Sequence, residues 1–151
     1  MADPELVIMR YLAALQAGDT ETVRGLFAED ATWTLAAGDL PISGRWEGRD
    51  VILYEFLATA LSYYEPGSAS FEVTGMISED SRVVLTWISR ARTRAGLPYE
   101  NECIGVFTVR DGLIESVREW MDTLYAHDRA FAPVGARPFR PATDETKEMA
   151  R

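Results

Sequence analysis

Hydrophobic residues recur at helical spacing in three stretches of the first half of the chain. The first stretch begins after Asp3, has Pro4 in its first turn and ends at Gly18, a combination typical of helix boundaries. A second, shorter helix is expected from about Thr20 to Ala28, and a third from Arg49 or Asp50 to about Tyr64. The third helix is expected to turn Val51, Tyr54, Leu57 and Leu61 inward.

After Pro66-Gly67 the pattern changes to an alternation of apolar and polar residues. This period of two predicts strands, and turn-forming pairs such as Asp111-Gly112 separate them as in antiparallel hairpins. A further strand is expected at Ala31–Ala36, before the third helix. The four later strands are predicted at Ser70–Ile77, Arg82–Thr93, Tyr99–Arg110 and Leu113–Leu124.

Helices followed by a strand meander define an α+β protein. The 151 residues suggest one domain with its own core. We assign residues 1–131 to this domain. Residues 132–151, which contain three prolines, are expected to form an irregular tail.

The composition narrows the range of partners. The net charge is -9, which disfavours nucleic acids and anionic membranes. No apolar run approaches the ~18 residues of a membrane-spanning helix, and no signal peptide is visible, so we expect a cytoplasmic protein. A single histidine, His127, and a single cysteine, Cys103, cannot assemble a zinc site of the usual Cys/His type. There is also no glycine-rich phosphate loop, and we expect no metal and no cofactor.

Glu119 is the most informative single residue, because it lies in an otherwise apolar strand near the C-terminus. A carboxylate in such surroundings costs several kcal/mol unless it is protonated, paired or used. Glu119 is therefore the best candidate for proton chemistry. The alternative is a structural carboxylate that bonds to a tyrosine, a tryptophan or an amide.

Hairpin geometry predicts which side chains share a face with Glu119. A turn around Gly96 would pair Arg92 with Glu100 and Arg90 with Glu102 on an outer face. A three-residue loop at Asp111-Gly112 would place Glu119 opposite Cys103 on the inner face, with Ser116, Arg118 and Trp120 pointing away. The inner face would carry a mixture typical of a pocket lining: Trp87, Ser89, Ala91, Asn101, Cys103 and Gly105.

The segments RYLAALQAGD, LFAEDATW and CIGVFTVRDGLIESVREWMD, together with the order of elements, resemble the NTF2-like, SnoaL-like superfamily over residues 4 to 131. That group contains ketosteroid isomerases, polyketide cyclases and limonene-type epoxide hydrolases. The resemblance implies a cone, in which a curved, mostly antiparallel sheet wraps around three N-terminal helices and a deep apolar pocket. It also implies a homodimer.

The resemblance implies that only some of the family's functional residues have a counterpart in this sequence. The cyclase and hydrolase acid/base carboxylate corresponds to Glu119, within REW, and the isomerase hydroxyl donor corresponds to Tyr11. The cyclase histidine and the isomerase oxyanion-hole acid fall near Gly105, and the isomerase proton shuttle falls on Leu35. These groups are missing, as are the epoxide hydrolase residues that fall around Trp33, Leu35, Trp87 and Ser89. Ketosteroid isomerisation and limonene-type hydrolysis are therefore disfavoured.

We predict a candidate site in which Glu119 acts as acid or base, with Tyr11 or Asn101 polarising a ligand oxygen. For three candidate residues a structural role is the alternative: Tyr11 as a core tyrosine, Cys103 as an inert core residue and Asp122 as a local cap. The predicted binding residues are Trp33, Trp46, Tyr54, Trp87, Cys103 and Asp122.

Two functions of different classes remain open at this point. The first is a small cofactor-free enzyme of cyclase, isomerase, dehydratase or hydrolase type, acting on a hydrophobic, oxygen-bearing small molecule. The second is a non-catalytic module of the same fold that binds a small ligand, or a scaffold that serves dimerisation.

Overall fold

The computed structural model describes residues 3–35 and 40–136. Two helices, α1 (Pro4–Ala17) and α2 (Thr20–Leu26), precede β1 (Phe27–Leu35) and β2 (Gly44–Glu47). A composite helix follows, made of α3 (Arg49–Val51), a π-helical turn (Ile52–Phe56) and α4 (Leu57–Leu61). The remaining strands are β3 (Ser70–Glu79), β4 (Arg82–Arg92), β5 (Pro98–Arg110) and β6 (Leu113–Met121). A last helical segment contains α5 (Thr123–Ala126), a second π-helical turn (His127–Phe131) and a 3-10 turn (Ala132–Val134).

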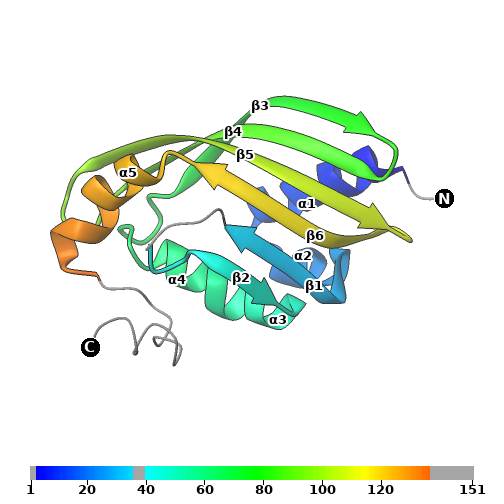
Figure 1. Ribbon diagram of the computed structural model, residues 1–151, viewed down its shortest axis with the longest axis horizontal. Helices are drawn as coiled ribbons and strands as arrows, with labels where there is room; N and C mark the ends of the chain where they lie inside the picture. The colour runs from blue at the N-terminus through cyan, green and yellow to red at the C-terminus, as the bar shows by residue number, and fades with distance from the viewer. Residues whose placement is uncertain (1–2, 36–39, 137–151) are drawn as a thin grey trace, which may run out of the picture.

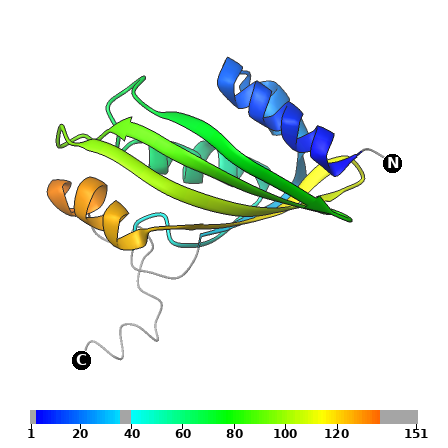
Figure 2. The ribbon, with the colours of Figure 1, turned by 90° about the horizontal axis from the view of Figure 1, so that it is seen from above.

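The six strands form one curved, mixed sheet in the order β2-β1-β6-β5-β4-β3 (Figure 1). Only β1 and β6 run parallel, while the other neighbours are antiparallel. Seen from above, α1 and the α3–α4 helix lie on the same side of the sheet, and α5 lies at its end (Figure 2). The core lies between these helices and the sheet, where side chains such as Ile8, Ile52 and Val117 are fully buried.

The first helix begins and ends as the sequence predicts. The Asp3 side chain caps it by accepting a hydrogen bond from the Glu5 backbone N–H at 3.0 Å. Gly18 ends it in the left-handed conformation, with a φ of 67° that glycine adopts without steric cost. Val7, Ile8, Tyr11 and Ala14 form its buried side. Along the described part of the chain, no helix is both long and apolar enough to span a bilayer.

Three expectations about the elements are corrected. The described residues form four helical regions rather than three N-terminal ones, because Thr123–Val134, placed partly in a strand and partly in an irregular tail, is helical. The edge strand β2 was not expected, and residues 137–151 of the predicted tail lie outside the described residues. The composite helix also contains a π-helical turn, which rotates its later residues relative to a regular helix. Ile52, Leu53 and Phe56 form the buried side of this helix at ordinary helical spacing. Tyr54, predicted to point inward, lies off this side and is 57% exposed.

The strand register confirms the predicted faces but moves the partners by two residues. Arg90 pairs with Glu100 rather than Glu102. Glu119 pairs with Gly105 rather than Cys103, because the chain turns tightly at Asp111-Gly112 and a bulge follows. A shift of two residues leaves the side-chain alternation unchanged, so Glu119 still points to the inner face.

Candidate functional site

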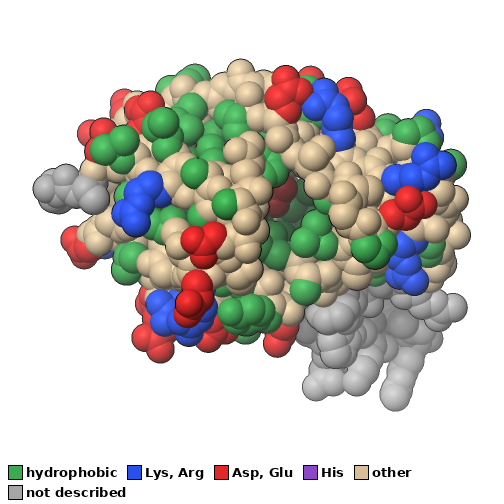
Figure 3. Space-filling view, turned by 180° about the vertical axis from the view of Figure 1, so that it is seen from behind, with side chains coloured by type: hydrophobic (Ala, Val, Ile, Leu, Met, Phe, Trp, Pro, Cys, Tyr) green, Lys and Arg blue, Asp and Glu red, His purple; other side chains and the backbone are tan. Residues whose placement is uncertain are grey.

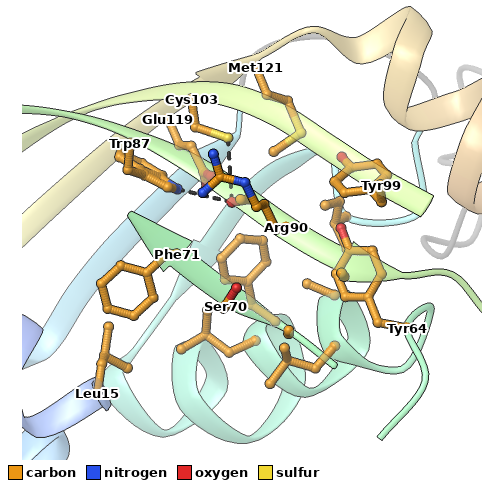
Figure 4. Close-up of a pocket in the computed structure, with 18 of the residues that line it drawn as sticks. Leu15, Tyr64, Ser70, Phe71, Trp87, Arg90, Tyr99, Cys103, Glu119 and Met121 are labelled. Atoms are coloured by element: carbon orange, nitrogen blue, oxygen red, sulfur yellow. Dashed lines mark hydrogen bonds between the residues drawn. The ribbon is translucent and has the colours of Figure 1, made fainter. Parts of the chain in front are cut away.

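A cavity of about 380 Å³ lies between the helices and the inner face of the sheet. Figure 3 shows a hollow with an acidic side chain at its base and apolar side chains around it. Glu119 is the one carboxylate among the described lining residues, and most of the others are apolar or aromatic. Figure 4 shows how strands β3 to β6 and the helices contribute to the walls. The polar or aromatic lining residues include Tyr11, Trp33, Phe56, Tyr64, Trp87, Ser89, Tyr99, Cys103, Phe107 and Glu119.

Glu119 projects into the cavity from the centre of the sheet. Its side chain is 8% exposed, and its Oε2 accepts a hydrogen bond of 2.9 Å from the indole N–H of Trp33 on β1. The two residues meet because β1 runs parallel beside β6. Burial raises the pKa of Glu119 from 4.5 to about 7, and the Trp33 hydrogen bond opposes this rise. The carboxyl group can therefore hold or release a proton near neutral pH.

Tyr11 reaches the same cavity from the inward side of α1. Its ring is 4% exposed and contacts Phe27 and Phe107, with centroids 5.7 Å and 5.8 Å away. The hydroxyl group forms no hydrogen bond with any residue that the structure describes. Burial, and secondly the charge of Glu119, raise the pKa of Tyr11. Tyr11 thus stays protonated and is suited to donate a hydrogen bond to a ligand oxygen.

Trp87 explains why position 105 carries no functional side chain. A Cβ atom added to Gly105 would lie 3.1 Å from the Trp87 ring and 3.0 Å from the Phe107 ring. The Trp87 indole N–H donates to Ser89 Oγ at 3.1 Å, and Ser89 Oγ lies 3.8 Å from Cys103 Sγ. The space that a side chain at position 105 would need is thus occupied by two aromatic rings.

Cys103 lies in the cavity wall but is not poised as a nucleophile. Burial, and secondly the charge of Glu119, raise the pKa of its thiol to about 12. The thiolate, which is the reactive form, is therefore scarce at neutral pH. Cys103 accordingly contributes a small, soft surface to the cavity.

Two tyrosines of the cavity were not predicted from the sequence. Tyr64 follows α4, and Tyr99 lies near the start of β5, with ring centroids 5.2 Å apart. An isolated antiparallel β-bridge to Thr93, at the end of β4, holds Tyr64 in place. This contact joins distant segments, so no local sequence pattern predicts it. The alternation of β5 could have placed Tyr99 on the inner face, since it shares the parity of Asn101 and Cys103.

Four other predicted residues, Asn101, Asp122, Trp46 and Tyr54, do not line the cavity. Asn101 is 3% exposed and bonds to Tyr99 and to the backbone of Asp122. Asp122 caps α5 by accepting from the Tyr125 N–H at 2.9 Å. The indole N–H of Trp46 donates to the Ile42 carbonyl at 3.0 Å within the core. Tyr54 faces solvent and takes no part in the cavity, which corrects its prediction as a binding residue.

The charges near the cavity are mostly compensated. Arg90 is the one cation among the described lining residues, and its guanidinium bonds Glu72 at 2.7 Å and Glu100 at 2.9 Å. His127, the single histidine, is exposed and pairs with Asp128 at 3.0 Å. Among the described residues, no three His, Cys, Asp or Glu side chains lie close enough to hold a metal ion.

The fold and the cavity together define an NTF2-like protein. The model of the SnoaL-like domain matches residues 8–117, and the chain therefore belongs to the SnoaL-like family. No curated protein sequence matches the chain.

Solved structures agree with this fold. An NTF2-like protein of unknown function from Burkholderia pseudomallei superposes with a TM-score of 0.76 at 17% identity, covering 86% of this chain and 98% of that chain. TerC, co-crystallised with polyporic acid, superposes with a TM-score of 0.73 at 22% identity, covering 83% and 97%. Bal32a, from a soil-derived mobile gene cassette, superposes with a TM-score of 0.71 at 27% identity, covering 83% and 93%.

Proposed function

We propose that this protein is a cofactor-free enzyme that moves a proton to or from a hydrophobic, oxygen-bearing small molecule. Glu119 carries the proposal, because a buried carboxyl group with a pKa of about 7 lines a mostly apolar cavity of about 380 Å³. Perturbed carboxyl groups in a cleft are typical of acid/base sites. The crystallisation of TerC, which shares the fold, with polyporic acid gives limited support for a small-molecule ligand.

In this mechanism each side chain has a separate task. Trp33 holds one carboxyl oxygen of Glu119, which leaves the other free to exchange a proton with the ligand. The Tyr11 hydroxyl donates a hydrogen bond to the ligand oxygen where negative charge develops. The aromatic walls exclude water and strengthen both interactions. Isomerisation, dehydration, cyclisation and hydrolysis all need this proton transfer, and the ligand decides among them.

The Glu119→Gln variant tests this role, since glutamine keeps the shape and the Trp33 hydrogen bond but cannot exchange a proton. We would screen enones, epoxides and polyketide-like ketones for turnover. The variant should lose about 10²- to 10⁴-fold in rate, the usual contribution of a general acid or base. In the wild type, kcat/KM should change near pH 7, where Glu119 titrates. A Glu119→Gln variant with full activity would exclude the role.

A non-catalytic binding module is the second candidate. The absence of polar side chains at Gly105 and Leu35, where the resemblance places catalytic groups, favours it. Tight binding of a screened compound without turnover, unchanged in Glu119→Gln, would support this candidate instead. A scaffold that serves dimerisation alone would be expected to fill its pocket with its own side chains, whereas this protein retains a cavity of about 380 Å³.

We also propose that the protein forms a homodimer through the outer face of its sheet. Ile104 and Trp120 lie opposite each other on this face and are 40% and 37% exposed. Ile77 on β3, two strands from β5 in the same sheet, is 72% exposed. Light scattering should give twice the chain mass, and Trp120→Glu should give the monomer. A monomeric wild type at micromolar concentration would refute the proposal.

A further inference from the structure

The Asn101 amide is held in one orientation by the backbone of Asp122. Its Oδ1 accepts from the Asp122 N–H at 3.3 Å, and its Nδ2 donates to the Asp122 carbonyl at 3.0 Å. The reverse orientation would oppose donor to donor and acceptor to acceptor, so it is excluded. The amide NH₂ group, rather than the amide oxygen, therefore faces the neighbouring Tyr99.

This orientation determines where the Tyr99 proton can go. Asn101 Nδ2 donates to the Tyr99 hydroxyl oxygen at 2.9 Å, so Tyr99 is the acceptor in that bond. Tyr99 cannot donate to Asn101, because an NH₂ group offers no lone pair. Its own O–H must point to Tyr64 or into the cavity, which both tyrosines line.

Tyr64 and Tyr99 carry one hydroxyl proton each, and at most one of these two protons can be donated from one tyrosine to the other. Burial, and after it the charge and the hydroxyl of Tyr99, raise the pKa of Tyr64, so both hydroxyl groups stay protonated. Even when one hydroxyl donates to the other, the second O–H has no acceptor among the described residues. A donor in the cavity wall without an acceptor is unfavourable unless a ligand or a water molecule accepts its hydrogen bond.

The backbone holds this pair in place. The Glu65 N–H donates to the Arg92 carbonyl at 2.8 Å, and the Arg94 N–H donates to the Tyr63 carbonyl at 3.0 Å. These bonds fix the segment after α4 to the end of β4, on either side of Tyr64. The Tyr99 ring lies between Tyr64 and Tyr125, with centroids 5.2 Å and 5.3 Å away. The hydroxyl pair is thus preorganised, as a binding site needs.

We propose that Tyr64 and Tyr99 form a second polar contact of the cavity, which donates one phenolic O–H to an oxygen acceptor of the ligand. Tyr99 lies six residues along β5 from Gly105, the partner of Glu119, so the two polar contacts are well separated. Figure 4 shows Tyr64 and Tyr99 side by side in the cavity wall. The inference rests on the proposed function and extends it: the ligand is an apolar molecule with a carbonyl or ether oxygen at each end.

Matched pairs of rigid ketones test this inference. The probes are acetophenone, acetylnaphthalene and acetylbiphenyl, each compared with its diacetyl counterpart that carries carbonyl groups at opposite ends. Dissociation constants are measured by isothermal titration calorimetry. At the length that spans both contacts, the second carbonyl should tighten binding to the wild type about 3- to 10-fold, as one additional hydrogen bond would.

Phenylalanine variants distinguish a tyrosine pair that donates a hydrogen bond to the ligand from a pair that only supports the structure. Tyr64→Phe and Tyr99→Phe each leave one hydroxyl, so part of the diketone advantage should remain in either. The double variant should lose the diketone advantage, so that each diketone binds no more tightly than its monoketone. Tyr63→Phe is the matched control, because Tyr63 packs on Phe131 beside the cavity without lining it.

The outcomes separate this inference from the proposed function. Equal affinities for mono- and diketones at every length, including no detectable binding of either, would refute the second contact. So would a diketone advantage that survives in the double variant. Full activity of Glu119→Gln, found together with a diketone advantage that needs the tyrosines, would refute only the role of Glu119.

Discussion

Replacing Glu119 by glutamine should stabilise the protein at neutral and alkaline pH, although it removes the proposed catalytic group. Burial raises the pKa of Glu119 from 4.5 to about 7, a difference of about 2.5 units. One unit corresponds to 1.36 kcal/mol, so the ionised carboxylate costs the folded protein about 3 kcal/mol. Glutamine has no charge to bury and keeps an oxygen for the Trp33 hydrogen bond.

The pH dependence has a definite sign. A carboxyl group with a higher pKa in the folded chain binds more protons when folded, so stability falls as pH rises. The loss begins near pH 4.5, the unfolded value, and levels off above about pH 7, the folded value. The advantage of Glu119→Gln should therefore be close to zero at pH 4 and about 3 kcal/mol at pH 8.

Urea denaturation of both proteins between pH 4 and pH 9 measures this difference. Glu115→Gln is the matched control, because Glu115 lies on the same strand with a side chain 41% exposed and paired to Arg110. Its effect should stay within about 1 kcal/mol at every pH, as for a surface ion pair. A difference between wild type and Glu119→Gln that does not change with pH would refute the reasoning from burial.

Three further predictions concern the surroundings of Glu119. Gly105→Ala should destabilise the protein by about 1–3 kcal/mol in thermal unfolding, because its Cβ would meet aromatic rings at 3.0 and 3.1 Å. The control Gly25→Ala, in a helix with open space around it, should be neutral or stabilising. Equal effects of the two substitutions would contradict the predicted clash. Trp33→Phe should raise the pKa of Glu119 above about 7 in a carbon-13 NMR titration, because it removes a hydrogen bond that stabilises the charged carboxylate. A lower pKa in the variant would contradict this. Native Cys103 should resist a thiol reagent at pH 8 and react after unfolding, because burial raises its pKa to about 12; fast native reaction would show an open thiolate.

Local chemistry made part of this structure predictable. Asp3 and Gly18 fix the ends of α1 through interactions within a few residues. The side-chain alternation of strands places Glu119 and Cys103 on one face even when the register is wrong by two residues, because such a shift preserves parity. The acid at the centre of the site could therefore be chosen from the sequence.

The remaining features depend on contacts between distant segments. Tyr54 points outward because the composite helix packs on the core through Ile52, Leu53 and Phe56, and an apolar stretch alone does not decide which side meets the core. Tyr64 meets Tyr99 only because the chain after α4 pairs with the end of β4. Likewise, Trp33 reaches Glu119, 86 positions along the chain, through the parallel pairing of β1 and β6. None of these has a signal in the nearby sequence.

The position of β6 in the sheet has a consequence for how the chain acquires its structure. This strand is the last of the six in sequence, yet it lies between β1 and β5. Until β6 takes its place, β1 and β5 each lack a neighbour on that side, and unpaired strand edges promote association between chains. When β6 joins the sheet, it pairs with both edges and brings Glu119 to Trp33 in the same event. The Glu119–Trp33 hydrogen bond and the loss of these two unpaired edges therefore arise together.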